Sequence, residues 1–224
     1  MLLRSKIIYW GSKENQNYSS GCDILLVGYE DDENLGLRYI CSFLNYHNVR
    51  AQIQPYHKSA KDAVLDRIQK DKPEIVGFSL IFQRMLGDFK GLIEYLRYRG
   101  VTAHFTMGGH FPTIEFKQVL EMIPGLDTVI RHEGEETLLE LFRNLHSPDL
   151  WPQVKGIAYR TGRNVEVTAP RPLIKDLDSL PFPVRSNELR NTGLASVIAS
   201  RGCYYDCNFC SIQELSIYYT PIMF

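Results

Sequence analysis

The stretch DILLVGYEDDENLGLRYICSFLNY, residues 23–46, decides the fold. Its first six residues form a compact apolar run that ends in Gly28, which predicts a buried strand. The second half, residues 34–46, repeats large side chains at helical spacing: Leu35, Tyr39, Phe43 and Tyr46. A buried strand followed directly by an amphipathic helix is the repeating unit of an α/β sheet.

The same unit repeats four more times along the chain. Apolar runs predict further strands, and amphipathic stretches predict further helices. The strands are expected over 50–55, 73–80, 102–107 and 127–130, and the helices over 60–70, 86–98, 113–122 and 135–145. Five such units predict an α/β fold with a flavodoxin-like (Rossmann-like), doubly wound, five-stranded parallel sheet. Ligands of such sheets bind beyond the carboxyl ends of the strands, here residues 28–34, 79–83, 108–113 and 132–137.

A hairpin and a linker follow this domain. Residues 155–160 and 164–168 flank the turn Thr161-Gly162-Arg163, which predicts a β-hairpin. The prolines between Pro170 and Pro183 predict an extended linker. Residues 195–200 then predict the first strand of a barrel with alternating strands and helices. We expect an arm over 1–21, a cofactor domain over 22–147, the hairpin and linker over 148–193 and the start of a barrel domain over 194–224.

The composition excludes several classes of protein. The 224 residues are 44% hydrophobic with a net charge of −1, as expected for a globular chain of one or two domains. A near-neutral charge argues against a nucleic-acid binder. The sequence contains no run of 18 apolar residues, so no membrane span is predicted. The first 20 residues lack a signal-peptide core. With no sign of disulfides, we expect a cytoplasmic protein.

Three cysteines near the end carry the strongest chemical signal. Cys203, Cys207 and Cys210 lie in RGCYYDCNFC, residues 201–210. Three thiolates on one tight loop can bind three irons of a [4Fe–4S] cluster and leave the fourth iron open. A structural zinc site is the alternative, but it needs four ligands, and Cys22 and Cys41 are isolated. The odd number of cysteines disfavours disulfides.

This motif closely resembles the signature of the radical S-adenosylmethionine enzymes, including Phe209 before the third cysteine. Other segments resemble the cobalamin-binding subgroup of that family, and they occur in the family's order. They are NLGLRY (34–39), GGHFPT (108–113), EGEET (133–137) and the linker LDSLPFP (177–183). The resemblance covers about residues 22–212. It implies a cobalamin-binding domain and S-adenosylmethionine bound at the cluster and split reductively to a 5′-deoxyadenosyl radical, in a methyltransferase or a ring-forming enzyme.

The expected cofactor residues follow from these loops. Glycines remove side chains where a corrin must approach, although the pair 108–109 could equally serve an ordinary tight turn. The free N–H groups at a helix start can meet amide oxygens or a phosphate. We expect cofactor-binding residues at Asn34, Leu35, Gly36, Ser79, Gly108, Gly109, His110, Glu135, Thr137 and Phe209, and metal ligands at Cys203, Cys207 and Cys210.

No histidine is available in the first loop. Cobalamin mutases supply a cobalt ligand from a D-x-H-x-x-G loop, whereas residues 28–36 here read GYEDDENLG. The radical subgroup commonly lacks this histidine as well. His110 is the nearest candidate by position, and a polar residue at a helix start is the alternative. The same ambiguity applies to His132.

The chain supplies little of a barrel. Only 14 residues follow Cys210, whereas a complete barrel takes about 200 residues. We therefore expect the N-terminal part of an enzyme, truncated after the cluster motif and inactive alone, with the barrel missing or on a separate subunit. One alternative is a stand-alone cobalamin-binding carrier or regulatory module with a vestigial cysteine loop. Another is a flavodoxin-like regulatory domain with a structural metal.

Overall fold

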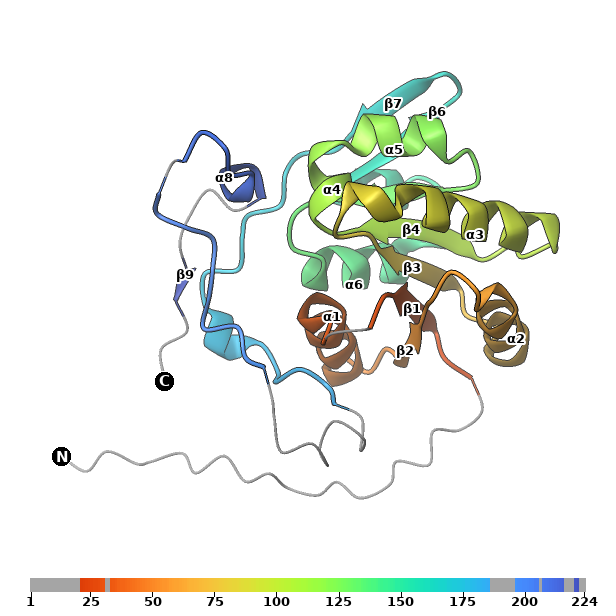
Figure 1. Ribbon diagram of the computed structural model, residues 1–224, viewed down its shortest axis with the longest axis horizontal. Coiled ribbons are helices and arrows are strands. Elements are labelled where there is room, and N and C mark those ends of the chain that lie inside the picture. The colour runs from red at the N-terminus through yellow and green to blue at the C-terminus, as the bar shows by residue number, and fades with distance from the viewer. Residues whose placement is uncertain (1–20, 31–32, 186–195, 206, 216–219, 222–224) are drawn as a thin grey trace.

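A computed structural model describes residues 21–30, 33–185, 196–205, 207–215 and 220–221. Residues 1–20 of the arm predicted over 1–21 lie outside the described residues, as do positions 186–195, where the linker meets the predicted barrel strand, and most of the tail after residue 215. The described part contains a seven-stranded sheet covered by helices on both faces (Figure 1).

The parallel part of the sheet has the predicted flavodoxin-like strand order. Its strands are, in space, β2 (Ala51–Pro55), β1 (Ile24–Gly28), β3 (Ile75–Ser79), β4 (His104–Gly108) and β5 (Thr128–Ile130). The register pairs Gly28 with Ser79 and Ser79 with Gly108. The last residues of three strands are therefore level, and the loops that follow them meet at one edge of the sheet.

Alternating side chains of β1 explain why both faces are covered. Leu25 and Val27 pack into one apolar cluster, whereas Ile24 and Leu26 pack into the other. Helices α2 (Lys61–Asp71), α3 (Leu86–Tyr98) and α5 (Phe116–Met122) contribute to the first cluster, and α1 (Leu35–Tyr46) and α6 (Glu135–Asn144) contribute to the second. The doubly wound prediction is confirmed. The remaining described helices are short: Gln83–Met85, α4 (His110–Ile114), Trp151–Gln153, Leu177–Ser179 and α8 (Ile212–Leu215).

Two elements differ from their predictions in form. The helix predicted over 113–122 begins earlier and is divided into α4 and α5 at Glu115. Pro112 lies in the first turn of α4, where a missing N–H is tolerated. The predicted hairpin is present as β6 (Ile157–Thr161) and β7 (Asn164–Val167), but it joins the sheet antiparallel to β5 and raises the strand number from five to seven.

The strand predicted over 195–200 is wrong in extent. Only Ser200–Arg201 forms a strand, β8, which pairs antiparallel with β9 (Thr220–Pro221). Residues 196–199 have no regular structure. No described strand lies beside them to accept their backbone hydrogen bonds, and Val197 is exposed. Within the described residues, no helix is both long enough and apolar enough to span a membrane.

Candidate functional site

Asn34 and Ser79 meet at the centre of the carboxyl edge. The Asn34 side chain caps α1 by accepting a hydrogen bond from the N–H of Leu37 at 3.2 Å. Its amide nitrogen donates to the Ser79 hydroxyl at 3.4 Å. Gly28 makes this arrangement possible, because a β-carbon there would lie 2.5 Å from a methyl of Leu37. Two predicted cofactor residues are thus brought together, and they bind each other.

The start of α1 continues this edge towards solvent. Leu35 is half-buried and Gly36 is exposed, in the first turn of the helix. A β-carbon at Gly36 would lie 3.6 Å from the Asn34 side chain, an ordinary contact. The two residues therefore adjoin the Asn34–Ser79 pair as the sequence predicted, and a role in cofactor binding stays a prediction.

The glycine pair after β4 has an internal explanation. Gly109 has a φ of 115°, and a β-carbon there would lie 2.4 Å from the carbonyl oxygen of Leu80. The Thr113 hydroxyl donates to the Gly109 carbonyl at 2.8 Å. The tight-turn alternative therefore accounts for Gly109 without any corrin. A β-carbon at Gly108 would make only an ordinary contact, 3.6 Å from the carbonyl of Ile130.

The two histidines at this edge differ in their contacts. His110 begins α4 and is exposed, although desolvation by neighbouring atoms lowers the pKa of its imidazole. His132 is half-buried with a φ of 63°, and its Nδ1 donates to the Leu215 carbonyl at 3.1 Å. This bond agrees with the structural role that the sequence left open for His132. His110 stays the candidate for the cobalt face.

The start of α6 is held by the chain's own arginines. Glu135 is 3% exposed and its carboxylate lies 2.6 Å from the Arg201 guanidinium. Thr137 is fully buried and its hydroxyl accepts a hydrogen bond from Arg171 at 2.9 Å. Both were predicted to bind a cofactor through a free helix start. In the structure their side chains bind the segment that follows the sheet.

Further ion pairs fasten this segment to the same edge. Glu33 pairs with Arg185 at 3.1 Å and accepts the N–H of Ser196 at 2.8 Å. Arg38 of α1 pairs with Glu30 and donates to the Val184 carbonyl at 3.0 Å. The sequence did not predict these contacts. The partners lie up to 163 positions apart, so no local spacing in the sequence indicates them. Only the complementary charges of the two segments are a signal for them.

Burial and charge oppose each other in these pairs. Burial alone would lower the pKa of Arg201, but the carboxylates of Glu135 and Glu133 outweigh it and raise that pKa above its ordinary value. Burial would likewise raise the pKa of Glu33, but hydrogen bonds from Ser196 and the charge of Arg185 hold it below the usual range. At Glu30 burial wins, and the pKa of its carboxyl is raised despite Arg38.

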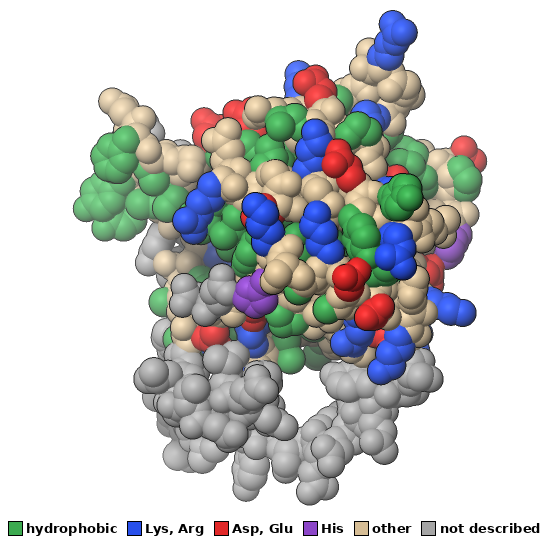
Figure 2. All heavy atoms as spheres, turned by 45° about the vertical axis from the view of Figure 1, so that its right-hand side comes forward, with side chains coloured by type: hydrophobic (Ala, Val, Ile, Leu, Met, Phe, Trp, Pro, Cys, Tyr) green, Lys and Arg blue, Asp and Glu red, His purple; other side chains and the backbone are tan. Residues whose placement is uncertain are grey.

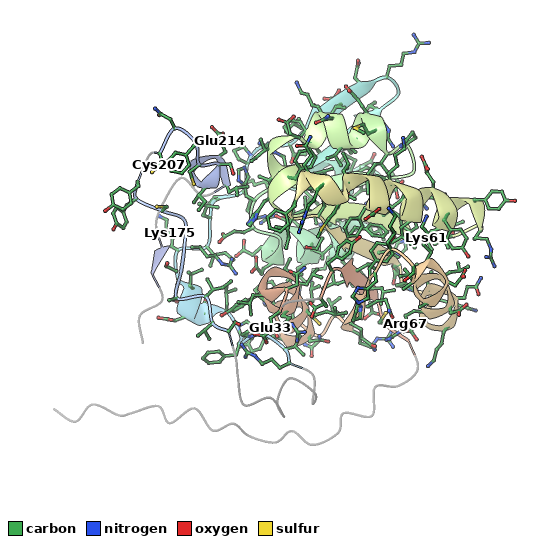
Figure 3. All side chains as sticks on the ribbon, viewed as in Figure 1. Glu33, Lys61, Arg67, Lys175, Cys207 and Glu214 are labelled. Carbon is green, nitrogen blue, oxygen red and sulfur yellow. The ribbon has the colours of Figure 1, made fainter. Side chains whose placement is uncertain are left out.

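The cysteine loop projects from the sheet domain on the side of this edge. Figure 3 places Cys207 and Glu33 on one side of the molecule and Lys61 and Arg67 on the other. Cys203, Cys207 and Cys210 are half-buried. Within the described residues, no three or more His, Cys, Asp or Glu side chains are arranged to hold a metal ion. Three thiols within eight residues nevertheless match the donor set of an iron–sulfur cluster, and the cluster stays a prediction.

Exposed aromatic side chains accompany the cysteines. Phe209 is 93% exposed, and the rings of Tyr204 and Tyr205 lie 4.3 Å apart, both exposed. Figure 2 shows hydrophobic side chains gathered on a part of the molecule that projects beyond its body. The structure places Phe209 beside the cysteines, as predicted, and its role at a cluster is untested.

A wide hollow in the described part of the chain lies elsewhere. It is open, measures about 1150 Å³ and is lined at the amino ends of the strands by Lys72, Glu74, His104 and Asp127, among others. Two of its charged groups, Arg97 and Asp127, pair with each other at 2.6 Å. Ligands of doubly wound sheets bind at the opposite edge, so this hollow is not the candidate site.

Solved structures of cobalamin-dependent enzymes share this fold. The radical S-adenosylmethionine methyltransferase TsrM from Kitasatospora setae, with cobalamin and a [4Fe–4S] cluster bound, matches 89% of the chain and 43% of its own length, with a TM-score of 0.73 and 16% identity. The cobalamin-dependent S-adenosylmethionine radical enzyme OxsB matches 90% of the chain and 30% of its own length, with a TM-score of 0.73 and 20% identity. At these identities the likeness establishes the fold.

Curated relatives and a family model agree with this likeness. The anaerobic magnesium-protoporphyrin IX monomethyl ester cyclase of Synechocystis sp. is 34% identical over 125 residues, 53% of this chain and 25% of the cyclase. An uncharacterized methyltransferase of Pyrococcus horikoshii is 28% identical over 184 residues, 79% of this chain and 40% of that protein. The chain thus spans less than half the length of either. The B12 binding domain model matches residues 21–142, more than half of the 224 residues. The chain therefore belongs to the B12-binding domain family.

Proposed function

We propose that this chain is the cobalamin-binding and cluster-binding part of a cobalamin-dependent radical S-adenosylmethionine enzyme. Membership of the B12-binding domain family supports the cobalamin half of this proposal. One observation carries the rest: Arg201, two positions before Cys203, is bound by Glu133 and Glu135 at the carboxyl edge of the sheet. The cysteine loop therefore starts at the edge where cobalamin is expected.

The sheet edge offers groups suited to a corrin with amide arms. The carboxylate oxygen Oε1 of Glu30 and Nε of Arg38 are buried without a hydrogen-bond partner in the described part of the chain. An unpaired buried polar atom is costly, so both atoms favour a ligand that accepts from Arg38 or donates to Glu30. Amides do both. Gly36, at the start of α1, and His110, after β4, are exposed. We assign the cobalamin-binding surface to the loops after β1, β3 and β4.

Cys203, Cys207 and Cys210 would bind three irons of a cluster, and the fourth iron would bind S-adenosylmethionine. The chemistry that such a cluster would supply, when bound and reduced, is the one electron needed to split S-adenosylmethionine into methionine and a 5′-deoxyadenosyl radical. The chain's own residues hold the loop that presents these thiolates. Turnover would be a methyl transfer or a ring-forming step, and it would need a barrel, from further residues or from another subunit, to bind the substrate.

Anaerobic reconstitution with iron, sulfide and hydroxocobalamin tests this function. We expect corrin absorption bands that persist after desalting, together with a broad iron–sulfur shoulder. Cys203→Ala, Cys207→Ala and Cys210→Ala should each lose the shoulder and most of the iron while keeping the corrin bands. Cys22→Ala is the matched control and should keep both.

The outcomes separate the alternatives. Corrin bands without a cluster in the unsubstituted chain would favour a stand-alone cobalamin-binding module. Absence of both would contradict the proposal as a whole. Full iron content in all three loop variants would show that these cysteines do not hold the cluster.

A further inference from the structure

A single arginine connects the cysteine loop to two helices of the cobalamin-binding domain. Arg201 donates to Glu133 at 2.9 Å through one terminal nitrogen and to Glu135 at 2.6 Å through the other. Its guanidinium carbon also lies 5.6 Å from the ring centre of Tyr39 in α1. Glu133 lies in the loop before α6, and Glu135 is the first residue of α6. The Arg201 side chain thus contacts both α1 and the start of α6 at the sheet edge.

These contacts are largely withdrawn from solvent. The side chains of Arg201, Glu133 and Glu135 are 18%, 13% and 4% exposed. Water screens such pairs much less than it screens surface pairs, so their geometry is held firmly. Glu133 is itself fixed, because its second oxygen accepts the N–H of Ile174 at 2.5 Å.

A second contact holds the other side of the loop. Leu215, five positions after Cys210, accepts a hydrogen bond at 3.1 Å from His132. His132 is next to Glu133, and its φ of 63° is unusual for a residue other than glycine. The segment 132–135 therefore binds the chain both before and after the three cysteines.

We propose that Arg201 is a positioning residue that fixes the cysteine loop at a set distance and orientation from the cobalamin edge. This inference rests on the proposed function, because it concerns the geometry between its two cofactors. An arginine is suited to this role since its planar fork can donate to two carboxylates at once, whereas a lysine offers one compact charge. Substitution of Arg201 should leave both cofactors bound and change only the distance and orientation between them.

The magnetic interaction between the unpaired spin of cob(II)alamin and that of the reduced cluster reports the distance and orientation between the two cofactors. The full chain is reconstituted anaerobically with hydroxocobalamin, iron and sulfide and then reduced to contain cob(II)alamin and the paramagnetic [4Fe–4S]⁺ state. The microwave power needed to saturate the cob(II)alamin signal is compared with the cluster oxidised and reduced. We expect a nearby reduced cluster to raise this power in the unsubstituted chain. Arg201→Gln should lose most of the increase, and Arg201→Lys should retain part of it.

Two further variants keep the test specific. Glu135→Gln should reproduce the loss, and adding it to Arg201→Gln should have little further effect, because both remove the same contact. Arg171→Gln is the matched control: Arg171 also binds α6 carboxylates, Glu136 and Glu140, but lies 30 positions before Arg201. It should leave the increase unchanged.

The results distinguish this inference from the function on which it rests. If the unsubstituted chain binds neither cofactor, the proposed function fails. If it binds both and Arg201→Gln keeps the full increase, the function stands and the positioning role is wrong. Loss of either cofactor from Arg201→Gln and Glu135→Gln would also overturn it, since Arg201 would then serve assembly rather than position.

Discussion

The five cysteines fall into two classes that differ in the burial of their side chains. Cys22 and Cys41 are 2% and 3% exposed and belong to the two apolar clusters of the sheet. Burial, helped by the nearby negative charge of Asp71, raises the pKa of Cys22 to about 11, and burial raises the pKa of Cys41 to about 12. The three loop cysteines are half-buried. We therefore expect the reactive thiols to be the three cysteines of the loop.

We expect a thiol reagent at pH 8 to modify Cys203, Cys207 and Cys210 in the folded apo-protein and to spare Cys22 and Cys41. With pKa values of about 11 and 12, the buried thiols are ionised at only about one part in a thousand or less at this pH. Mass spectrometry of labelled peptides measures the pattern, and denaturant should expose all five. Because the raised pKa values favour the protonated folded state, stability should fall as the pH rises above about 9. Rapid labelling of Cys41 in the native state would contradict the assignment.

Residues at strand ends were predictable, but their partners were not. Asn34, Ser79 and Gly108 follow directly from where the apolar runs end, because parallel strands bring their carboxyl ends to one edge. Glu135 and Thr137 were also placed correctly at the start of α6. Their binding to Arg201 and Arg171 depends on how a distant segment folds back, and local patterns contain no information about that.

At the scale of elements, the turn from β4 into α4 depends on one glycine. Gly109 lies between them with a positive φ, and its α-carbon passes close to the backbone of Leu80 just after β3. The Thr113 hydroxyl closes the turn by donating to its carbonyl and also accepts the N–H of His132 at 3.0 Å. The turn therefore links the loops after β3, β4 and β5.

Gly109→Ala should lower the free energy of unfolding by about 1–3 kcal/mol or more, because alanine is strained at this φ and its methyl meets the Leu80 carbonyl. Gly108→Ala should change it by less than about 1 kcal/mol, since the added methyl makes only an ordinary contact. Urea unfolding followed by circular dichroism compares the two. Equal effects of the neighbouring substitutions would show that the turn geometry is not the cause.

Elements with strong local signals were predicted well. The five parallel strands and their helices follow from apolar runs and helical stripes, which depend only on neighbouring residues. Pairing partners were harder. The hairpin was recognised from its turn, but its place beside β5 depends on the unpaired edge that β5 leaves. The short β8 shows the converse, since an apolar run without a partner along its length does not become a full strand.

At the scale of the molecule, the sheet domain extends past the family match at residue 142. The hairpin closes the β5 edge, and Ile157 and Ala158 of β6 are fully buried within the apolar clusters. Val154, just before β6, is 1% exposed. The described residues after the hairpin contact the carboxyl edge through Arg171, Arg185 and Arg201. The folding unit therefore includes the hairpin, and the linker is attached to it.

A fragment of residues 21–147 should consequently be less stable than one of residues 21–169. Removing the hairpin exposes the edge of β5 and uncovers the surface that Val154 and Ile157 bury. At about 1.5–3 kcal/mol for each of these side chains, the loss is about 3–6 kcal/mol as an upper estimate. An exposed parallel sheet edge also favours aggregation. Urea unfolding and light scattering of the two fragments measure both effects.

Substitutions in the full chain test the same point without cutting it. Ile157→Ala should lower the free energy of unfolding by about 2–5 kcal/mol, because it leaves a cavity in the core. Val167→Ala is the matched control on β7, where the side chain is 41% exposed, and it should have a small effect. If the short fragment unfolds at the same urea concentration as the long one, and Ile157→Ala behaves like Val167→Ala, the hairpin is an appendage. The cobalamin-binding unit would then end with α6, and contacts beyond Asn144 would contribute only to the placement of the cysteine loop.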